Sequence, residues 1–419
     1  MKTDPQSIVI GAGIVGICTA LYLQEKGRQV TLIDRMAPGE GTSSGNAGII
    51  SVGSVHPEAM PGIWKEIPHM LLQRRAPISL RPAYLPHIIP WFASFLASSS
   101  VARADQSSVG ISALSIRALD FLQPLVQKAN ATALLQQEGS IYVSETAAQF
   151  AAAKRNCAYY DRRGVDYQII EGGELIELEP SLRPGLAGGV LVHAGGNSVS
   201  PLALSQSLFS LFQKQGGQFI QAEVTGFKTE CNRVTAVQTD SDLPCLEVCV
   251  TAGAYSKTLA KQLGSAVLLD TERGYNIQLP TPGIKLKRPL LFGARAFAVT
   301  SMQDGLRLAG TVEFAGLKAK PNYKRAYMLA EQAAYLFPKL NTEGGEPWMG
   351  YRPSMPDTVP VISASPNYAN VFFGFGHGHL GLTQAGVTGA MLSALATGDE
   401  PPVAVEQFRI DRGFFKDRV

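Results

Sequence analysis

Three glycines near the start of the chain have the spacing of a phosphate-binding turn. They form G-x-G-x-x-G between the apolar run SIVI and a segment with apolar residues at helical spacing. Glycines in this pattern allow a tight turn, bring backbone N–H groups close to a pyrophosphate and let the helix lie near the strand. The next strand, QVTLID, ends at an acid suited to ribose hydroxyls, so these elements together predict a dinucleotide site. The residues assigned to it are Gly11, Gly13, Ile14, Val15, Gly16, Asp34 and Arg35.

The loop that follows, GTSSGNAGII at 41–50, consists of small uncharged residues. A nicotinamide enzyme normally continues here with another crossover helix, whereas a small-residue loop can line a flat, bulky ring system. The serine hydroxyls are expected to bond a pyrophosphate and Asn46 to reach a ring edge. This favours FAD over NAD, and an ordinary flexible Gly/Ser loop is the alternative. The loop residues assigned to the cofactor are Thr42, Ser43, Ser44, Asn46, Ala47, Gly48 and Ile49.

A second cluster of small residues lies at 370–398, NVFFGFGHGHLGLTQAGVTGAMLSALATG. It predicts a strand that ends in glycines and a helix that starts near Thr383. A helix N-terminus there stabilises the negative charge that a reduced flavin gathers at N1 and C2=O. The strands CLEVCVTAGAYS and FIQAEVTGF suit the same nucleotide domain, the second near the adenine. The residues assigned from these segments are Val224, Ala252, Gly253, Gly376, Gly378, Leu380, Gly381, Leu382 and Thr383.

The composition is that of a well-packed globular protein. With 419 residues, 45% hydrophobic and 17% charged, two or three domains are expected. The net charge of +3 comes without a basic run, so nucleic acid is not an expected partner. The cysteines lack framework spacing, and no metal-ligand spacing is present. These features predict a cytoplasmic protein.

One apolar segment complicates that localisation. Residues 82–102 contain no Asp, Glu, Lys or Arg, but Pro86, Pro90 and a serine run argue against a spanning helix. Two interpretations stay open: a buried helix of the second domain, or peripheral contact with the inner face of the cell membrane through residues 84–101. In the second case the residues expected to enter the lipid are Trp91, Phe92, Phe95 and Leu96.

The chain resembles the FAD-dependent amino-acid oxidoreductases of the D-amino-acid oxidase superfamily, bacterial D-amino-acid dehydrogenase above all and glycine oxidase and sarcosine oxidase more distantly. The likeness rests on VIGAGIVG, IDR, TSSGNAG followed by IIS, LLQRRAPISLRP, RGYNIQLP, LRLAGTVEF, WMGYRPSMPDTVPVI and GHGHLGLT. It implies a mixed α/β fold in which a Rossmann-like FAD-binding domain is interleaved with a substrate domain of antiparallel or mixed sheet and helices. The expected FAD-binding domain comprises residues 1–80, 190–265 and 346–419, and the substrate domain comprises 81–189 and 266–345.

The resemblance also implies an activity. An amino acid is oxidised at Cα by hydride transfer to flavin N5, and the imino acid hydrolyses to a keto acid and ammonia. Small neutral or cyclic D-amino acids are the expected substrates, D-proline and D-hydroxyproline included, and a respiratory quinone or artificial acceptor takes the electrons. Two alternatives stay open: an oxygen-using oxidase of glycine, sarcosine or D-amino acids, and a flavin subunit of a larger dehydrogenase with a partner subunit.

Four residues are candidates for contact with the substrate. Arg352, in GYRP, matches the arginine that binds the substrate carboxylate in glycine oxidase. Where glycine oxidase has a second arginine, this chain has His379, which either bonds the substrate or only lines the pocket. Tyr275, in RGYN, either adds a bond to the carboxylate or packs, and His56 is a weaker candidate. No acid–base residue is assigned, because a neutral amine held over N5 transfers hydride directly.

Overall fold

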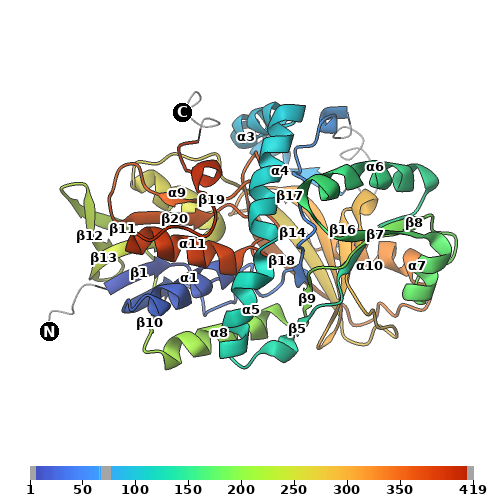
Figure 1. The fold of residues 1–419 in the computed structure, drawn as a ribbon, viewed down its shortest axis with the longest axis horizontal. Coiled ribbons are helices and arrows are strands. Elements are labelled where there is room, and N and C mark those ends of the chain that lie inside the picture. Colours follow the sequence, from blue (N-terminus) through green and yellow to red (C-terminus); the bar gives the residue numbers. More distant parts are fainter. Residues whose placement is uncertain (1–5, 66, 68–76, 413–419) are drawn as a thin grey trace.

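The structure is a computed structural model that describes residues 6–65, 67 and 77–412. An eight-stranded sheet occupies the left half of Figure 1 and a nine-stranded sheet the right half, with helices packed on both. The mixed α/β fold class predicted from the sequence is confirmed. Residues 71–76, half of the motif LLQRRAPISLRP, lie outside the described residues.

The eight-stranded sheet is built around the N-terminal strand. Its parallel strands lie in the order β10 (Gln218–Gln221), β2 (Val30–Asp34), β1 (Gln6–Ile10), β13 (Asp242–Val250) and β20 (Val371–Phe375). Antiparallel partners extend it: β12 (Arg233–Gln238) and β11 (Gly226–Glu230) beyond β13, and β19 (Val361–Ala364) beside β20. The carboxyl ends of the parallel strands therefore meet at one edge, where such sheets bind ligands.

Both faces of this sheet are buried, which explains its continuous apolar runs. Val9 and Leu32 pack under helices on one face, and Ile8 and Ile10 pack on the other. The helices on the first face are α1 (Ile14–Glu25), α5 (Ala118–Lys128), α8 (Pro201–Lys214) and α11 (Ala385–Thr397). Helix α9 (Ser256–Gln262) and the β11–β12 hairpin cover the second face.

The nine-stranded sheet faces the cofactor loop. Its order is β18 (Glu346–Ser354), β14 (Asp270–Leu279), β17 (Gly305–Phe314), β16 (Phe297–Met302), β15 (Leu290–Phe292), β6 (Ser140–Ser144), β8 (Gly188–Val192) and β7 (Tyr167–Glu171), and β4 (Ile78–Leu80) pairs with β17. Helix α10 (Lys324–Leu336) packs on one face of β14 and β17. On the other face, Asn276 donates a hydrogen bond to the carbonyl oxygen of Gly45 (2.5 Å). Helices α6 (Ala147–Arg163) and α7 (Gly172–Leu178) lie beside β6, β7 and β8.

A small sheet joins the cofactor loop to the rest of the protein. It contains β3 (Ile49–Ile50), β9 (Gly196–Ser198) and β5 (Leu135–Gln136). Strand β3 directly follows the small-residue loop, so its pairing with β9 fixes the end of that loop.

Sheet membership differs from the expected domain division at three places. Strands β4, β8 and β18 all belong to the nine-stranded sheet, although their residues fall wholly or partly in segments expected in the FAD-binding domain. For β18 the reason is its pairing, which joins Asp270–Gln278 to Glu346–Ser354 residue by residue. The strand that carries the GYRP motif is thus a strand of the second sheet.

The uncharged segment forms helix α3 (Leu85–Ser98), and its aromatic residues point inward. Trp91 and Phe95 are only 4% and 8% exposed, and their rings stack. The indole N–H of Trp91 donates to a backbone carbonyl at the end of β18, a partner that lipid would not supply. The expectation that these residues enter lipid is therefore wrong for Trp91 and Phe95, while Leu96 is exposed.

Helices α4 (Val101–Ser115) and α5 run between the two halves in Figure 1. Within the described ranges, the stretch Val101–Lys128 is long and apolar enough to cross a membrane by length and composition alone. Half of its most apolar 18-residue window is buried inside the protein, and α5 packs against α11, as a core helix does. The stretch is weak evidence for a membrane span.

Candidate active site

A cavity of about 830 Å³ runs from the carboxyl ends of β1 and β2 to strand β18. All four candidates for substrate contact line it: Arg352, Tyr275, His379 and His56. The assigned cofactor residues that line it are Gly11, Gly13, Ile14, Val15, Asp34, Arg35, Thr42, Ser43, Asn46, Ala47, Ile49, Val224, Ala252, Gly253, Gly378, Leu380, Gly381, Leu382 and Thr383. Four assigned residues do not line the cavity: Gly16, Ser44, Gly48 and Gly376. They contact neighbouring protein atoms instead.

The glycine turn between β1 and α1 has no room for side chains. Gly11 has a φ of +108°, and a Cβ on it would lie 2.5 Å from the carbonyl oxygen of Thr251. A Cβ on Gly16 would lie 1.8 Å from the carbonyl oxygen of Gly11, so only a glycine lets the helix lie this close to the turn. The first and third glycines of the motif are therefore required by packing within the protein.

The same end of the cavity fits the phosphates and ribose of a dinucleotide. Helix α1 begins at Ile14 with Gly13 as an extended N-cap, and its first turn contains no acidic residue. Its positive dipole end is thus available to an anion. The carboxylate of Asp34 is fixed by the N–H groups of Ala12 (2.7 Å) and Met36 (2.9 Å). These features suit an adenosine diphosphate with an unphosphorylated ribose.

The small-residue loop is held by the nine-stranded sheet. Arg307 of β17 donates to the carbonyl oxygens of Ser44 (3.1 Å) and Asn46 (2.9 Å). A Cβ on Gly45 would lie 2.3 Å from the Trp348 ring. The hydroxyl of Thr42 bonds the backbone of Tyr351 in β18. Part of the loop's small size therefore serves contact with protein rather than with a flavin ring.

Two side chains expected to reach the cofactor turn back onto the loop. The Asn46 amide donates to the carbonyl oxygen of Ser43 (2.7 Å) and accepts from the N–H of Gly48 (2.7 Å). The Ser44 hydroxyl donates to the carbonyl oxygen of Gly41 (2.9 Å). Such local bonds are the ordinary behaviour of Asn and Ser in tight loops. Ser43 is different, because its hydroxyl accepts from the N–H of Ile14 at the helix start (2.9 Å).

The second glycine cluster connects the cofactor end to β18. Gly378, with a φ of +55°, donates its N–H to the carbonyl oxygen of Pro353 (2.8 Å). A Cβ on Gly376 would lie 2.6 Å from Met355 Cγ, so that glycine is needed for packing. His377 is buried, and burial lowers its pKa to about 4, so its ring is neutral. Helix α11 begins just after Thr383, whose hydroxyl accepts from the N–H of Ser51 (3.0 Å).

Arg352 brings a positive charge into the far end of the cavity. Its guanidinium donates to the carbonyl oxygens of Thr311 (3.1 Å) and Gly310 (3.5 Å). Thr311 has a φ of +54°, which is strained for a β-branched residue, and lies opposite the register shift between β14 and β17. Both acceptors are neutral, so the planar fork keeps donors for a carboxylate ligand.

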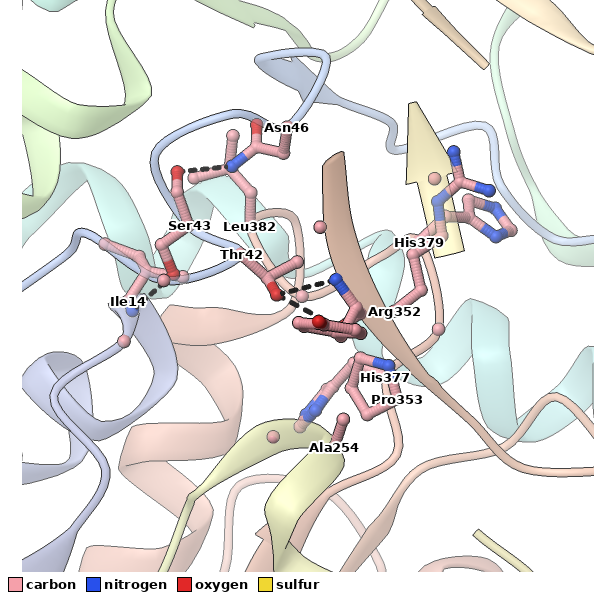
Figure 2. Close-up of a pocket in the computed structure, with 18 of the residues that line it drawn as sticks. Ile14, Thr42, Ser43, Asn46, Ala254, Arg352, Pro353, His377, His379 and Leu382 are labelled. Atoms are coloured by element: carbon pink, nitrogen blue, oxygen red, sulfur yellow. Dashed lines mark hydrogen bonds between the residues drawn. The ribbon is translucent and has the colours of Figure 1, made fainter. Parts of the chain in front are cut away.

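Two acids accompany this arginine. Nδ1 of His379 lies 2.8 Å from Oε1 of Glu58. The side chain of Glu58 is 38% exposed in the cavity. Desolvation by the surrounding protein favours its neutral form, but the hydrogen bond from His379 and the positive charge of Arg352 lower its pKa overall. Glu272 pairs with Arg352 in the β14–β18 register, and burial followed by the charge of Glu58 raises its pKa to about 8. Figure 2 shows the arginine and the histidine on the same side of the pocket, opposite Ile14.

The Tyr275 hydroxyl is not free for a substrate. It donates to Oε2 of Glu313 (2.5 Å) and accepts from the N–H of Asn322 (3.0 Å). Successive side chains of a strand point to opposite faces, and Gly274 is the residue that faces Arg352. Tyr275 therefore points to the face covered by α10, and the expected bond from its hydroxyl to the substrate carboxylate is not supported.

His56 lines the cavity and packs against aromatic rings. Its Nε2 is 3.1 Å from the carbonyl oxygen of Asn156, and its ring contacts Tyr159 and Tyr160. Burial lowers its pKa, although the backbone hydrogen bond opposes that shift. A neutral, packed histidine suits a wall residue.

Sequence reasoning missed Glu58, Glu272, Gly274, Asn276 and Arg307. Gly274 carries a readable signal, because an isolated glycine inside a strand marks close approach of another group. The other four carry none, since their roles depend on contacts between distant segments. Across the described part of the chain, no group of three or more His, Cys, Asp or Glu side chains is arranged to hold a metal ion.

Comparison with known proteins gives consistent findings. The model of the DAO family, described as FAD dependent oxidoreductase, matches residues 6–395. The chain is 33% identical over 410 residues to a D-amino-acid oxidase of Bradyrhizobium diazoefficiens, covering 96% of this chain and 97% of the relative. It is 31% identical over 416 residues to a D-amino acid dehydrogenase of Vibrio vulnificus, covering 96% and 99%.

Solved structures share the fold. Glycine oxidase from Geobacillus kaustophilus superimposes with a TM-score of 0.75 at 18% identity, over 97% of this chain and 98% of that one. L-proline dehydrogenase from P. horikoshii gives 0.73 at 16% identity, over 98% of each chain. At such identities the likeness concerns the fold alone.

Proposed function

The chain belongs to the DAO family of FAD-dependent oxidoreductases, and on that premise we propose that it oxidises D-amino acids at Cα and passes the electrons to an acceptor other than oxygen. The observation that carries the proposal is the position of Arg352. It lines the same cavity as the glycine turn and Asp34, and Figure 2 shows it across the pocket from Ile14, the first residue of α1. A ligand carboxylate held by the arginine is thereby kept in one cavity with a dinucleotide.

Bound FAD supplies a two-electron acceptor, and the protein supplies binding and orientation. Gly13, Ser43 and Asp34 would hold the adenosine diphosphate. The flavin ring would lie near Ile49 and residues 380–383, where the start of α11 provides a positive dipole end. The guanidinium of Arg352 would hold the substrate carboxylate, so that the orientation of Cα is set by the fork.

The cavity wall supports small neutral or cyclic substrates. Its lining includes apolar residues of β15, β16 and β17, among them Leu291, Ala298 and Ala309, together with Tyr142 of β6. Apolar walls exclude water and accommodate compact aliphatic side chains or a pyrrolidine ring. D-Alanine, D-proline and D-hydroxyproline are substrates of this class. The D configuration is supported by the names of the relatives, which are D-amino-acid oxidases and dehydrogenases.

The surface supports a membrane-borne acceptor. Leu85, Ile89 and Leu96 project from one side of α3 and are 46%, 55% and 43% exposed. Val101 and Trp64 are also exposed, by 72% and 59%. An exposed apolar surface of this kind suits shallow contact with the inner face of the cell membrane, where a respiratory quinone is available.

The test is anaerobic bleaching of the absorbance band of oxidised flavin at about 450 nm. The purified protein is mixed with D- and L-amino acids, D-proline, hydroxyproline isomers, glycine and sarcosine. Bleaching by D-amino acids alone, with dye reduction and little peroxide in air, is expected. Rapid peroxide formation would assign the chain as an oxidase instead. A yellow protein that no amino acid bleaches would contradict the proposal and favour a partner-dependent subunit.

A further inference from the structure

We propose that His379, oriented by Glu58, accepts the proton that the substrate's ammonium group must lose before its Cα–H bond breaks. This inference rests on the amino-acid oxidation proposed above, and it names the proton acceptor for that reaction.

The chemistry requires such an acceptor. At neutral pH an amino acid carries an ammonium group, which has no lone pair to support loss of hydride. Breaking one N–H bond leaves its electron pair on nitrogen and transfers the proton to the imidazole. The Cα–H bond then breaks, both electrons leave as hydride to the bound FAD, which is the two-electron acceptor, and the nitrogen lone pair forms the C=N bond. Protons and electrons therefore balance without a further reactant.

The geometry leaves one ring nitrogen free for this proton. His379 Nδ1 lies 2.8 Å from Glu58 Oε1, so in the neutral ring Nδ1 carries the hydrogen and Nε2 the lone pair. Among the residues that the structure describes, none hydrogen-bonds Nε2 of His379. The side chain is 43% exposed and lines the cavity. A carboxylate that orients a histidine and stabilises its charged form is a recurrent arrangement for general bases.

Backbone contacts fix this histidine next to the carboxylate anchor. The N–H of Gly378 donates to the carbonyl oxygen of Pro353 (2.8 Å), and Ser354 pairs with His377 in an isolated bridge. These contacts tie the loop that carries His379 to the strand that carries Arg352, and Figure 2 shows both side chains on the same side. An amino acid has its carboxyl carbon and its nitrogen on the same Cα. A carboxylate held by the arginine therefore brings the ammonium group near the histidine.

The surrounding charges suit a transient imidazolium. Desolvation acts against the charged form of Glu58, but the hydrogen bond from Nδ1–H of His379 and the positive charge of Arg352 lower its pKa, so Glu58 is ionised while the histidine ring is neutral. Glu272 and Asp270 face the same region from β14, and burial raises the pKa of both. Glu272, with a pKa of about 8, is a neutral donor at pH 7 rather than a second anion. The carboxylate of Glu58 is then free to stabilise the imidazolium.

The rival role for His379 is a second donor to the substrate carboxylate. The two roles differ in what they do to a ligand that lacks an amine. Loss of a carboxylate donor weakens binding of propionate as much as binding of an amino acid. Loss of a proton acceptor leaves propionate binding unchanged and slows only the reaction of the ammonium form.

The experiment measures the limiting rate of anaerobic flavin reduction by the best D-amino acid between pH 6 and 10. For H379A we expect a loss of about 10²- to 10³-fold at pH 7, recovery towards wild type at pH 10, and partial rescue by added imidazole. E58Q keeps a hydrogen-bond acceptor without the charge, so a loss of about 10-fold at pH 7 is expected. The exposed His193 provides the matched control, and H193A should follow the wild-type profile.

Propionate binding, followed by the change in flavin absorbance, is the second readout. Its Kd in H379A is expected to stay within about twofold of wild type, a difference of less than about 0.5 kcal/mol. A raised Kd with an equal loss of rate at every pH would overturn the proposal in favour of the carboxylate role, and an unchanged rate would overturn it outright. If no amino acid bleaches the wild-type flavin, the proposed function fails first and this inference with it.

Discussion

Gly274 and Arg352 lie so close together that a Cβ on residue 274 would come within 2.6 Å of the guanidinium carbon. Gly274 lies in the middle of β14, where a glycine costs about 0.5 to 1 kcal/mol relative to alanine. The glycine is therefore required by the arginine beside it and not by a turn. The absence of a side chain at residue 274 leaves the space in which Arg352, the proposed anchor of the substrate carboxylate, lies across β14.

A methyl group at this position should displace the anchor. In G274A we expect the Kd for propionate and the KM for the amino acid to rise by about 10-fold or more, about 1.4 kcal/mol, with flavin content unchanged. The measurement is ligand titration of the flavin spectrum. The control is G173A, because a Cβ on Gly173 of α7 meets nothing within 4 Å. Normal propionate binding by G274A would contradict the position of the arginine.

The cofactor loop should depend on Arg307. The substitution R307K removes the planar fork that reaches the carbonyl oxygens of Ser44 and Asn46. Loss of one or two hydrogen bonds of about 1 kcal/mol each should weaken FAD binding by about 10-fold. Dialysis followed by the ratio of flavin to protein absorbance measures this, with R233K, at the exposed first residue of β12, as control. Full flavin retention by R307K together with a raised KM would assign the arginine to the substrate instead.

Stability at acid pH should depend on His377. Its folded-state pKa of about 4 lies below the ordinary value of about 6.5, because the ring is buried. Between these values the unfolded chain binds more protons, so this residue lowers stability as pH falls from about 6.5 towards 4. In H377N the decline of Tm over this window should be shallower, by the equivalent of about 1 to 3 kcal/mol. The exposed His193 serves as control through H193N, and parallel Tm curves for wild type and H377N would contradict the assignment.

Vesicle binding should depend on the outer side of α3. The double variant I89Q/L96Q replaces two exposed apolar side chains without touching the buried Trp91. We expect its co-sedimentation with vesicles of anionic phospholipid to fall several-fold, while dye reduction in solution stays unchanged. Ile169 of β7 is also exposed, by 39%, and I169Q is the matched control. Equal sedimentation of wild type and double variant would remove the support for membrane contact.

Local signals could be predicted from the sequence, and contacts between distant segments could not. The turn at Gly11 and the acid at Asp34 lie in one strand–helix–strand unit, where residue type and spacing carry the information. Arg352 and His379 came from a resemblance to known proteins rather than from their own surroundings. The network of Glu58 and Glu272 depends on the β14–β18 register and on the path of the loop after β3, and neither has a local signature.

The small-residue loop shows where a correct pattern had an incomplete explanation. Its glycines predict close approach of another group, and the prediction from the sequence is that this group is a flavin ring. In the structure, Gly45 lies against the Trp348 ring and Gly48 against the carbonyl oxygen of Ser198. A glycine signals that space is needed, and only the fold says which neighbour needs it.

Thr42 has a consequence for the protein without its cofactor. Its hydroxyl donates to the carbonyl oxygen of Tyr351 (3.0 Å) and accepts from the N–H of the same residue (3.2 Å), bonds drawn in Figure 2. Strand β18 is the outermost strand of its sheet, so this single hydroxyl occupies a position that a neighbouring strand would otherwise take. Exposed strand edges invite pairing between molecules. A cofactor that holds the loop in place keeps Thr42 on this strand edge and so protects the enzyme from aggregation. The apoprotein is expected to self-associate more readily than the protein with FAD bound.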